Sequence, residues 1–162
     1  MFKLTLFTGA LWGCLIVLTA RAETSMSTLQ SLPAVGLELA PLPAEAGAFA
    51  LVEKDILDRL RRVLEARNVT LIGPEHVVDE PGRPVLEVTL QLAKVRGPSY
   101  LYTIDLELRE TVVPVRGLKS LVELDAVTWK RKTAGIANRG DTILEAMDRM
   151  ADDFATEYQR EN

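Results

Sequence analysis

Alternating apolar and polar residues predict most of the strands of this chain. The alternation is strict over residues 86–92, and it is nearly strict over residues 100–109, where Leu101 is the exception. Residues 96–99 separate these two segments at the length of a hairpin turn. The pattern therefore predicts two long antiparallel strands, each with one apolar face and one polar face.

Three further segments have the apolar content and the flanking turn residues of strands. Residues 35–39 alternate and lie between two prolines, and residues 69–72 end at a Gly-Pro pair. Residues 121–132 form the last predicted strand. Its alternation slips near Asp125 and Ala126, which predicts a β-bulge there.

Two segments have the period of amphipathic helices. The first covers residues 51–67, and the second begins after a predicted loop over residues 135–140, with Asp141 as its expected N-cap. The apolar stripes are Val52, Ile56, Leu60, Val63 and Leu64 in the first helix and Ile143, Met147, Met150, Phe154 and Tyr158 in the second.

The predicted order is strand, helix, four strands, helix. It indicates one α+β domain over residues 35–162, with a two-layer architecture in which an antiparallel-rich sheet of about four to five strands has two amphipathic helices on one face. This fold requires Thr103, Asp105 and Arg109 to face away from the helices. Residues 23–34 are polar and rich in Ser and Thr, so we expect them to form a flexible leader.

The first 22 residues have the composition of an export signal. Lys3 precedes an apolar run over residues 4–18, and Ala20-Arg21-Ala22 has the small-x-small pattern of a cleavage site. The run of about 15 residues is shorter than the roughly 20 that a spanning helix needs. We expect export to the periplasm and cleavage after Ala22. The alternatives are retention of the signal as an anchor and lipid attachment at Cys14.

Composition adds two exclusions. The chain has 162 residues, 48% of them hydrophobic and 26% charged, which are values typical of a globular domain. Its net charge of −4 argues against a general nucleic-acid binder. Cys14 is the only cysteine and would be removed with the signal, so a mature chain would have no disulfide and no thiolate.

No group of residues has the spacing of a catalytic or metal site. His76 is the only histidine, with Asp79 and Glu80 nearby, whereas zinc sites normally need three or four convergent ligands. The serines lie in the leader or in turns and outside any G-x-S-x-G motif. Asp105 and Glu107 share the polar face of one strand, where we expect them to be solvated. We therefore predict no catalytic, cofactor-binding or metal-binding residues and no cofactor.

The main basic cluster consists of Lys130, Arg131, Lys132 and Arg139. Neighbouring residues of a strand point to opposite faces, so we expect the cluster to be divided between the two faces of the sheet. Charged residues of this kind commonly protect an edge strand from mispairing. Contact with an anionic lipid is the alternative.

The closing part of the chain resembles a group of small exported bacterial proteins with no assigned activity. The resemblance rests on the aromatic strand segment 127–130, the glycine-bearing segment 134–136 and a final helix that ends in Phe154-x3-Tyr158. The helix at 51–67 and the strand pair 86–109 fit the same layout, so the resemblance covers roughly residues 35–160. The architecture is also similar to envelope accessory domains, such as the lipopolysaccharide-assembly lipoprotein and the amino-terminal domain of TolB. The resemblance implies an accessory role in the cell envelope. The chain departs from those lipoproteins because Cys14 is followed by further apolar residues.

Together these features predict a periplasmic, non-enzymatic accessory or binding protein of the bacterial cell envelope. A protein partner would bind by adding a strand to the sheet edge or at the helix face that bears Arg59 and Arg62. On that face we expect Arg59 to pair with Asp55 and Arg62 to pair with Asp58. The alternatives are a membrane-attached structural or assembly lipoprotein and a small hydrolase that uses His76 or a surface carboxylate.

Overall fold

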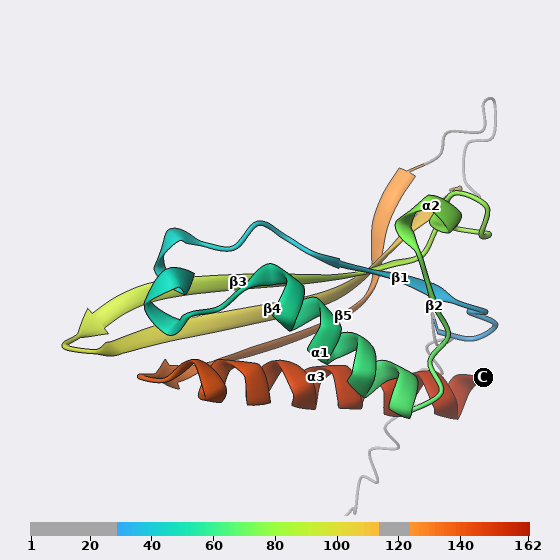
Figure 1. Cartoon of the computed structure of the whole chain (residues 1–162). Coiled ribbons are helices and arrows are strands. Elements are labelled where there is room, and N and C mark those ends of the chain that lie inside the picture. Colours follow the sequence, from blue (N-terminus) through green and yellow to red (C-terminus); the bar gives the residue numbers. More distant parts are fainter. Residues whose placement is uncertain (1–28, 114–123) are drawn as a thin grey trace, which may run out of the picture.

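A computed structural model describes residues 29–113 and 124–162, so the predicted signal, its cleavage site and Cys14 lie outside the described residues. Figure 1 shows the arrangement of the elements. In chain order they are β1 (Val35–Leu39), the 3₁₀ helix η1 (Ala44–Phe49), α1 (Glu53–Ala66), β2 (Leu71–Ile72), α2 (Pro74–Val77), β3 (Val85–Arg96), β4 (Ser99–Val112), β5 (Leu124–Ala137) and α3 (Gly140–Glu161).

The five strands form one mixed sheet in the order β2-β1-β3-β4-β5. The pairs β3–β4 and β4–β5 are antiparallel, whereas β1 pairs in parallel with both β2 and β3. The two long helices, α1 and α3, pack against each other and lie along one face of the sheet (Figure 1). The predicted two-layer α+β fold is confirmed, with η1 and α2 as short additions.

The apolar residues of β3 and β4 face the helices and form the centre of the core. The opposite face, called the open face below, carries Thr103, Asp105 and Arg109 beside the polar residues of β3. This arrangement confirms the division of faces that the alternation predicts. The buried core residues of the two strands are Leu86, Val88, Leu90, Tyr102, Ile104, Leu106 and Leu108.

Both helices bury the predicted stripes, except that Val63 is only partly buried and Val52 is exposed. Val52 is 51% exposed, because α1 begins only at Glu53 and Val52 is its N-cap, in extended conformation. In α3, Phe154 is fully buried and its ring meets that of Trp129 edge to face, with centroids 5.0 Å apart. Among the described helices, none combines the length and the apolar content needed to cross a membrane.

The boundary between β5 and α3 differs from the prediction of a loop over residues 135–140. β5 continues past Gly135, which lies opposite Tyr102 and leaves room for its ring: a Cβ on Gly135 would lie 2.6 Å from the Tyr102 hydroxyl oxygen. The helix then begins at Gly140 with Arg139 as its N-cap. The prediction that Asp141 is the N-cap is therefore wrong, and Asp141 lies in the first turn.

The irregularity in β5 lies later than the sequence pattern indicates. Leu108 pairs with Trp129 and Arg109 with Val127, so Thr128 is the additional residue. Its hydroxyl donates a hydrogen bond to a carboxylate oxygen of Glu110 on β4, at 2.5 Å. A β-bulge is present, as predicted, but at Thr128 instead of near residue 125.

Residues 29–34, predicted as part of a flexible leader, are packed against the end of α3. Leu29 and Leu32 are buried, with exposed fractions of 1% and 4%. The side-chain amide of Asn162 donates to the carbonyl oxygen of Leu29 (2.7 Å), and its oxygen accepts from the backbone N–H of Leu32 (3.1 Å). The leader prediction is wrong for these residues, because leucines three positions apart give them an apolar side; residues 23–28 lie outside the described part.

The core makes a direct prediction for Phe154→Ala. Removing a fully buried aromatic side chain leaves a cavity, so we expect the free energy of unfolding to fall by about 3–5 kcal/mol. Denaturant unfolding measures this change. The control is Ile136→Ala on the open face, where a 64% exposed side chain should change stability by no more than about 0.5 kcal/mol. Equal losses from the two variants would contradict the assignment of the core face.

Candidate functional site

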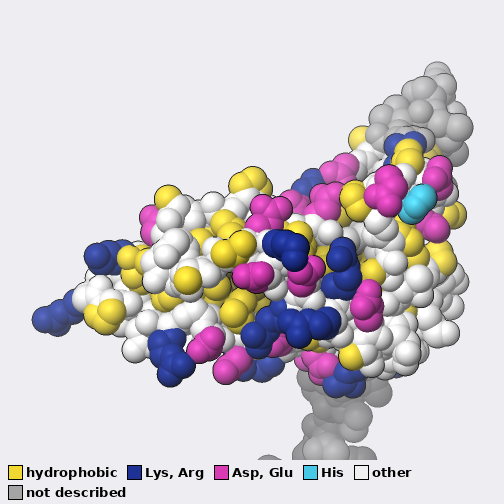
Figure 2. All heavy atoms as spheres, in the orientation of Figure 1, with side chains coloured by type: hydrophobic (Ala, Val, Ile, Leu, Met, Phe, Trp, Pro, Cys, Tyr) yellow, Lys and Arg dark blue, Asp and Glu magenta, His cyan; other side chains and the backbone are white. Residues whose placement is uncertain are grey.

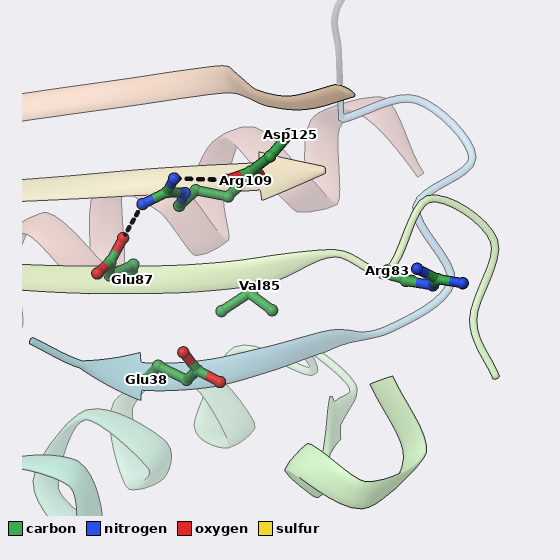
Figure 3. A pocket seen from close by; sticks show the side chains of 6 residues that line it. All are labelled: Glu38, Arg83, Val85, Glu87, Arg109 and Asp125. Atoms are coloured by element: carbon green, nitrogen blue, oxygen red, sulfur yellow. Dashed lines mark hydrogen bonds and ion pairs between the residues drawn. The ribbon is translucent and has the colours of Figure 1, made fainter. Parts of the chain in front are cut away.

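A network of charged side chains crosses the open face of the sheet. Arg109 on β4 donates hydrogen bonds to Glu87 on β3, at 2.8 Å, and to Asp125 on β5, at 2.5 Å (Figure 3). Beside it lies a cavity of about 260 Å³. The cavity is lined by Glu38, Arg83, Val85, Glu87, Arg109 and Asp125.

The charged side chains beside this cavity link three strands of the sheet. Arg109, the cation at their centre, has carboxylate partners and is therefore not free to bind an anion. The hydrogen bonds to Glu87 and Asp125 raise the pKa of Arg109, so its guanidinium group stays charged and already has two carboxylate partners. In Figure 3 the side chain of Arg83 points away from the Arg109 group. An anion would have to displace a carboxylate from Arg109 to bind here.

Asp105 lies at the centre of the network and is buried, with an exposed fraction of 7%. One carboxylate oxygen accepts a hydrogen bond from Lys132 (3.1 Å), and the other lies 3.2 Å from Lys130 Nζ in an ion pair without hydrogen-bond alignment. The expectation that Asp105 is solvated is wrong, because long side chains on the neighbouring strand β5 cover it. Glu107, which also pairs with Lys130, is partly buried.

The ion pairs determine the protonation state of Asp105. Burial by itself raises the pKa of this carboxyl, but the hydrogen bond from Lys132 and the charge attraction of Lys132 and Lys130 outweigh burial and lower the pKa below its ordinary value. Asp105 is therefore a carboxylate at neutral pH. A general acid needs a raised pKa, so the environment of Asp105 opposes that role.

The basic cluster at residues 130–132 is divided between the two faces of β5, as predicted. Lys130 and Lys132 lie opposite Glu107 and Asp105 on the open face, whereas Arg131 lies on the helix side. There Arg131 contacts Glu157 and Asp153 of α3, and it lies over the ring of Trp129 at 6.0 Å. All three cations are thus held by carboxylates of this chain.

The candidate catalytic and metal-ligating residues are not brought together. His76 lies on the short helix α2 with its side chain 67% exposed, and its Nε2 is 3.6 Å from a carboxylate oxygen of Glu75. Within residues 29–113 and 124–162, no group of three or more His, Cys, Asp or Glu side chains could hold a metal ion. Ser99 is the first residue of β4, and Ser120 lies outside the described residues.

Two arginines of α1 and its C-terminal end, Arg59 and Arg67, pair with carboxylates of α3. Arg59 forms a two-pronged contact with Asp148 of α3, with nitrogen–oxygen distances of 2.6 to 2.9 Å, and Arg67 lies 2.6 Å from Asp152. The predicted Asp55–Arg59 pair is therefore wrong, because α3 offers Arg59 a bidentate partner. Figure 2 shows this helix face, where basic and acidic side chains alternate closely.

Arg62 does not form the predicted ion pair with the Asp58 carboxylate. Its Nε donates to the backbone carbonyl of Asp58, at 3.2 Å, while the carboxylate of Asp58 pairs with Lys54 at 3.0 Å. On the helix face that bears them, Arg59 and Arg62 therefore already make contacts within this chain. Arg59 in particular joins α1 to α3.

Within residues 29–113 and 124–162, no strand pairs with the outer edge of β5. β5 covers Leu124–Ala137 and is the last strand of the sheet, with β4 as its neighbour. Three aliphatic side chains along it are strongly exposed: Leu124 at 47%, Val127 at 48% and Ile136 at 64%. The signal for this edge in the sequence is the presence of aliphatic residues at positions of the polar face.

Comparison with known proteins gives no family assignment. No protein-family model matches the chain, and no curated protein matches it. A solved structure of a minor lipoprotein from Acinetobacter baumannii aligns with 81% of this chain and 90% of its own chain, at 17% sequence identity and a TM-score of 0.35. That similarity is too distant to assign a fold or a function.

The buried carboxylate makes a pH-dependent prediction for Asp105→Asn. At neutral pH we expect a loss of about 1–2 kcal/mol, which is less than for a fully buried pair because Lys130 and Lys132 can turn to water. The folded-state pKa of Asp105 is lowered, so its contribution is complete above the ordinary value of about 4 and is lost as the pH falls through the lower folded value. The difference between variant and parent should therefore shrink below about pH 4.

Denaturant unfolding at a series of pH values measures this difference. The control is Asp55→Asn, an exposed carboxyl of α1, which should change stability by no more than about 0.5 kcal/mol at neutral pH. If the loss from Asp105→Asn stayed constant or grew in acid, the ion pairs of Asp105 would not be its source.

Proposed function

We propose that this chain is a non-enzymatic binding protein of the bacterial cell envelope, which binds an extended segment of a protein partner along the edge of β5. The proposed periplasmic location rests on the signal-like composition of residues 1–22. The proposed binding mode rests on one observation: β5 is an edge strand over Leu124–Ala137 and exposes aliphatic side chains along its length. Strand addition uses such an edge, because main-chain hydrogen bonds supply affinity.

Edge strands of soluble domains are commonly protected by charged side chains that oppose pairing with another strand. Here Lys130 and Lys132 extend toward β4, where Asp105 and Glu107 hold them, and Arg131 extends toward α3. Their charges are neutralised within the chain. The central part of β5 therefore offers its backbone to a partner strand without a strong electrostatic penalty.

The exposed side chains of β5 favour a particular type of residue in an added strand. On the open face, Val127 and Ile136 would contact alternate side chains of an added strand, so aliphatic residues are favoured there. Thr128 interrupts the regular register, which makes the segment from Trp129 to Ala137 the longest uninterrupted stretch. A partner segment of strand length with alternating aliphatic residues fits this surface.

The helix face is less suited to the same task. The bidentate contact between Arg59 and Asp148 joins α1 to α3, so a partner that captured Arg59 would have to separate the two helices. The β5 edge requires no such rearrangement. This difference favours the sheet edge over the helix face.

The proposal predicts that Val127→Lys weakens partner binding by about tenfold or more, because an added strand would have to desolvate the new charge. A photo-reactive residue at position 127, in the full chain expressed in its own cell, should form a cross-link with a discrete partner. Introducing Val127→Lys and Ile136→Lys into a chain with the photo-reactive residue at 124 should suppress that product. Hydrogen exchange of the purified complex should show new protection of β5 amides.

The matched control is position 52, because Val52 is an equally exposed valine on the helix face (51% against 48%). A photo-reactive residue at 52 should not form the same cross-link, and Val52→Lys should leave partner binding unchanged. Cross-linking from 52 in preference to 127, or a complex without new protection in β5, would refute strand addition at this edge.

A further inference from the structure

The hairpin between β3 and β4 projects from the molecule and ends in two basic residues. Its tip lies at the left end of Figure 1, beyond η1 and the start of α3. Arg96 pairs with Ser99 across the turn, and Gly97 has the positive φ of +57° that a two-residue turn requires. Lys94, Val95 and Arg96 are all exposed there.

The cations of the tip differ in their pairing from most others in the described chain. Lys130, Arg131, Lys132 and Arg139 each contact a carboxylate. Among the interactions within residues 29–113 and 124–162, by contrast, no ion pair includes Lys94 or Arg96.

The reason lies in the distribution of acidic residues. Between Glu87 and Asp105 the chain has no carboxylate, and β5 has none from residue 133 to its end. The neighbouring elements contribute Glu45 of η1 and Asp141 of α3, and Asp141 is already paired with Arg139 at 2.9 Å. The hairpin end of this acidic protein is therefore locally basic, and Figure 2 shows Lys and Arg side chains at the same end.

Apolar side chains accompany these charges. Val95, between the two basic residues, is 58% exposed. On the open face just behind the tip, Leu101 pairs with Ala93 of β3 and with Ile136 of β5, which forms an aliphatic row across three strands. In this row Leu101 is 43% exposed and Ile136 is 64% exposed. Exposed aliphatic groups flanked by unpaired cations match the two layers of a membrane surface, where anionic headgroups lie above acyl chains.

We propose that the tip of the β3–β4 hairpin docks on a membrane surface that carries anionic phospholipids. Lys94 and Arg96 contact the phosphate groups, and Val95 enters the boundary between headgroups and acyl chains. This contact is peripheral and reversible, because it combines two charges with a single small apolar side chain. It uses the end of the sheet farthest from residues 124–127 and does not depend on strand addition at β5.

The test compares binding of the full chain to two kinds of vesicle, one of phosphatidylcholine alone and one of phosphatidylcholine and phosphatidylglycerol in equal parts. The ratio of the two affinities isolates the charge-dependent contact from any contribution of the apolar N-terminal run, which is the same in all variants. A basic residue near an anionic surface contributes about fivefold, so Lys94→Gln with Arg96→Gln should lower the ratio by about 30-fold. High salt should abolish the preference of the parent chain for anionic vesicles.

The matched control removes two charges elsewhere, with Arg149→Gln and Arg160→Gln on exposed positions of α3. It should leave the ratio within about twofold of the parent, and unchanged thermal unfolding should show that both double variants are folded. An equal loss in the two double variants, or no loss in either, would overturn the proposal.

A second measurement locates the contact. In Val95→Trp, the new indole should shift its emission to shorter wavelength when anionic vesicles are added, because it leaves water for the headgroup region. Trp12 and Trp129 occur in both chains, so the shift that the parent chain shows is subtracted from that of Val95→Trp. Binding to anionic vesicles without such a shift would place the contact at another surface and would also overturn the proposal.

Discussion

The alternation of apolar and polar residues in β3 and β4 is the constraint on which the other features of this molecule depend. It directs side chains such as Leu108 and Ile104 to one face, where α1 and α3 cover them. Each fully buried aliphatic side chain contributes about 1.5–3 kcal/mol relative to an exposed one. A shift of register by one residue would exchange the two faces and expose the whole set. The open face and the charged network both follow from this assignment.

The fold was predictable from the sequence to the extent that it depends on local periodicity. The stripes of the two helices and the two long strands are periodic over many residues, and apart from Val52 at the start of α1 the structure places them as predicted. The pairing of β1 is different, because nothing in residues 35–39 indicates whether its neighbours run parallel or antiparallel. That information resides in the connection through α1 and in long-range packing.

Three of the incorrect predictions share a physical origin, since each concerns a residue whose partner is distant in sequence. Gly135 suggested a loop, but the ring of Tyr102 on the adjacent strand uses the space that its missing side chain leaves. Arg59 suggested a pair within its own helix, but Asp148 lies almost ninety residues further along the chain. Asp105 suggested a solvated carboxylate, but two lysines of β5 cover it. Short-range patterns do not contain these contacts.

The same principle explains why the basic sequence cluster and the free cations of the structure are different residues. The run at 130–132 has the highest local density of positive charge, but β5 lies beside the acidic residues of β4 and α3, so each of its cations gains a carboxylate partner. Lys94 and Arg96 are less conspicuous in the sequence, where they flank one valine before a turn. They remain unneutralised within the described chain because the strands beside the hairpin tip contain no carboxylate. Charge available for binding therefore depends on the sheet register, which determines the neighbours of each side chain, more than on the number of basic residues in a segment.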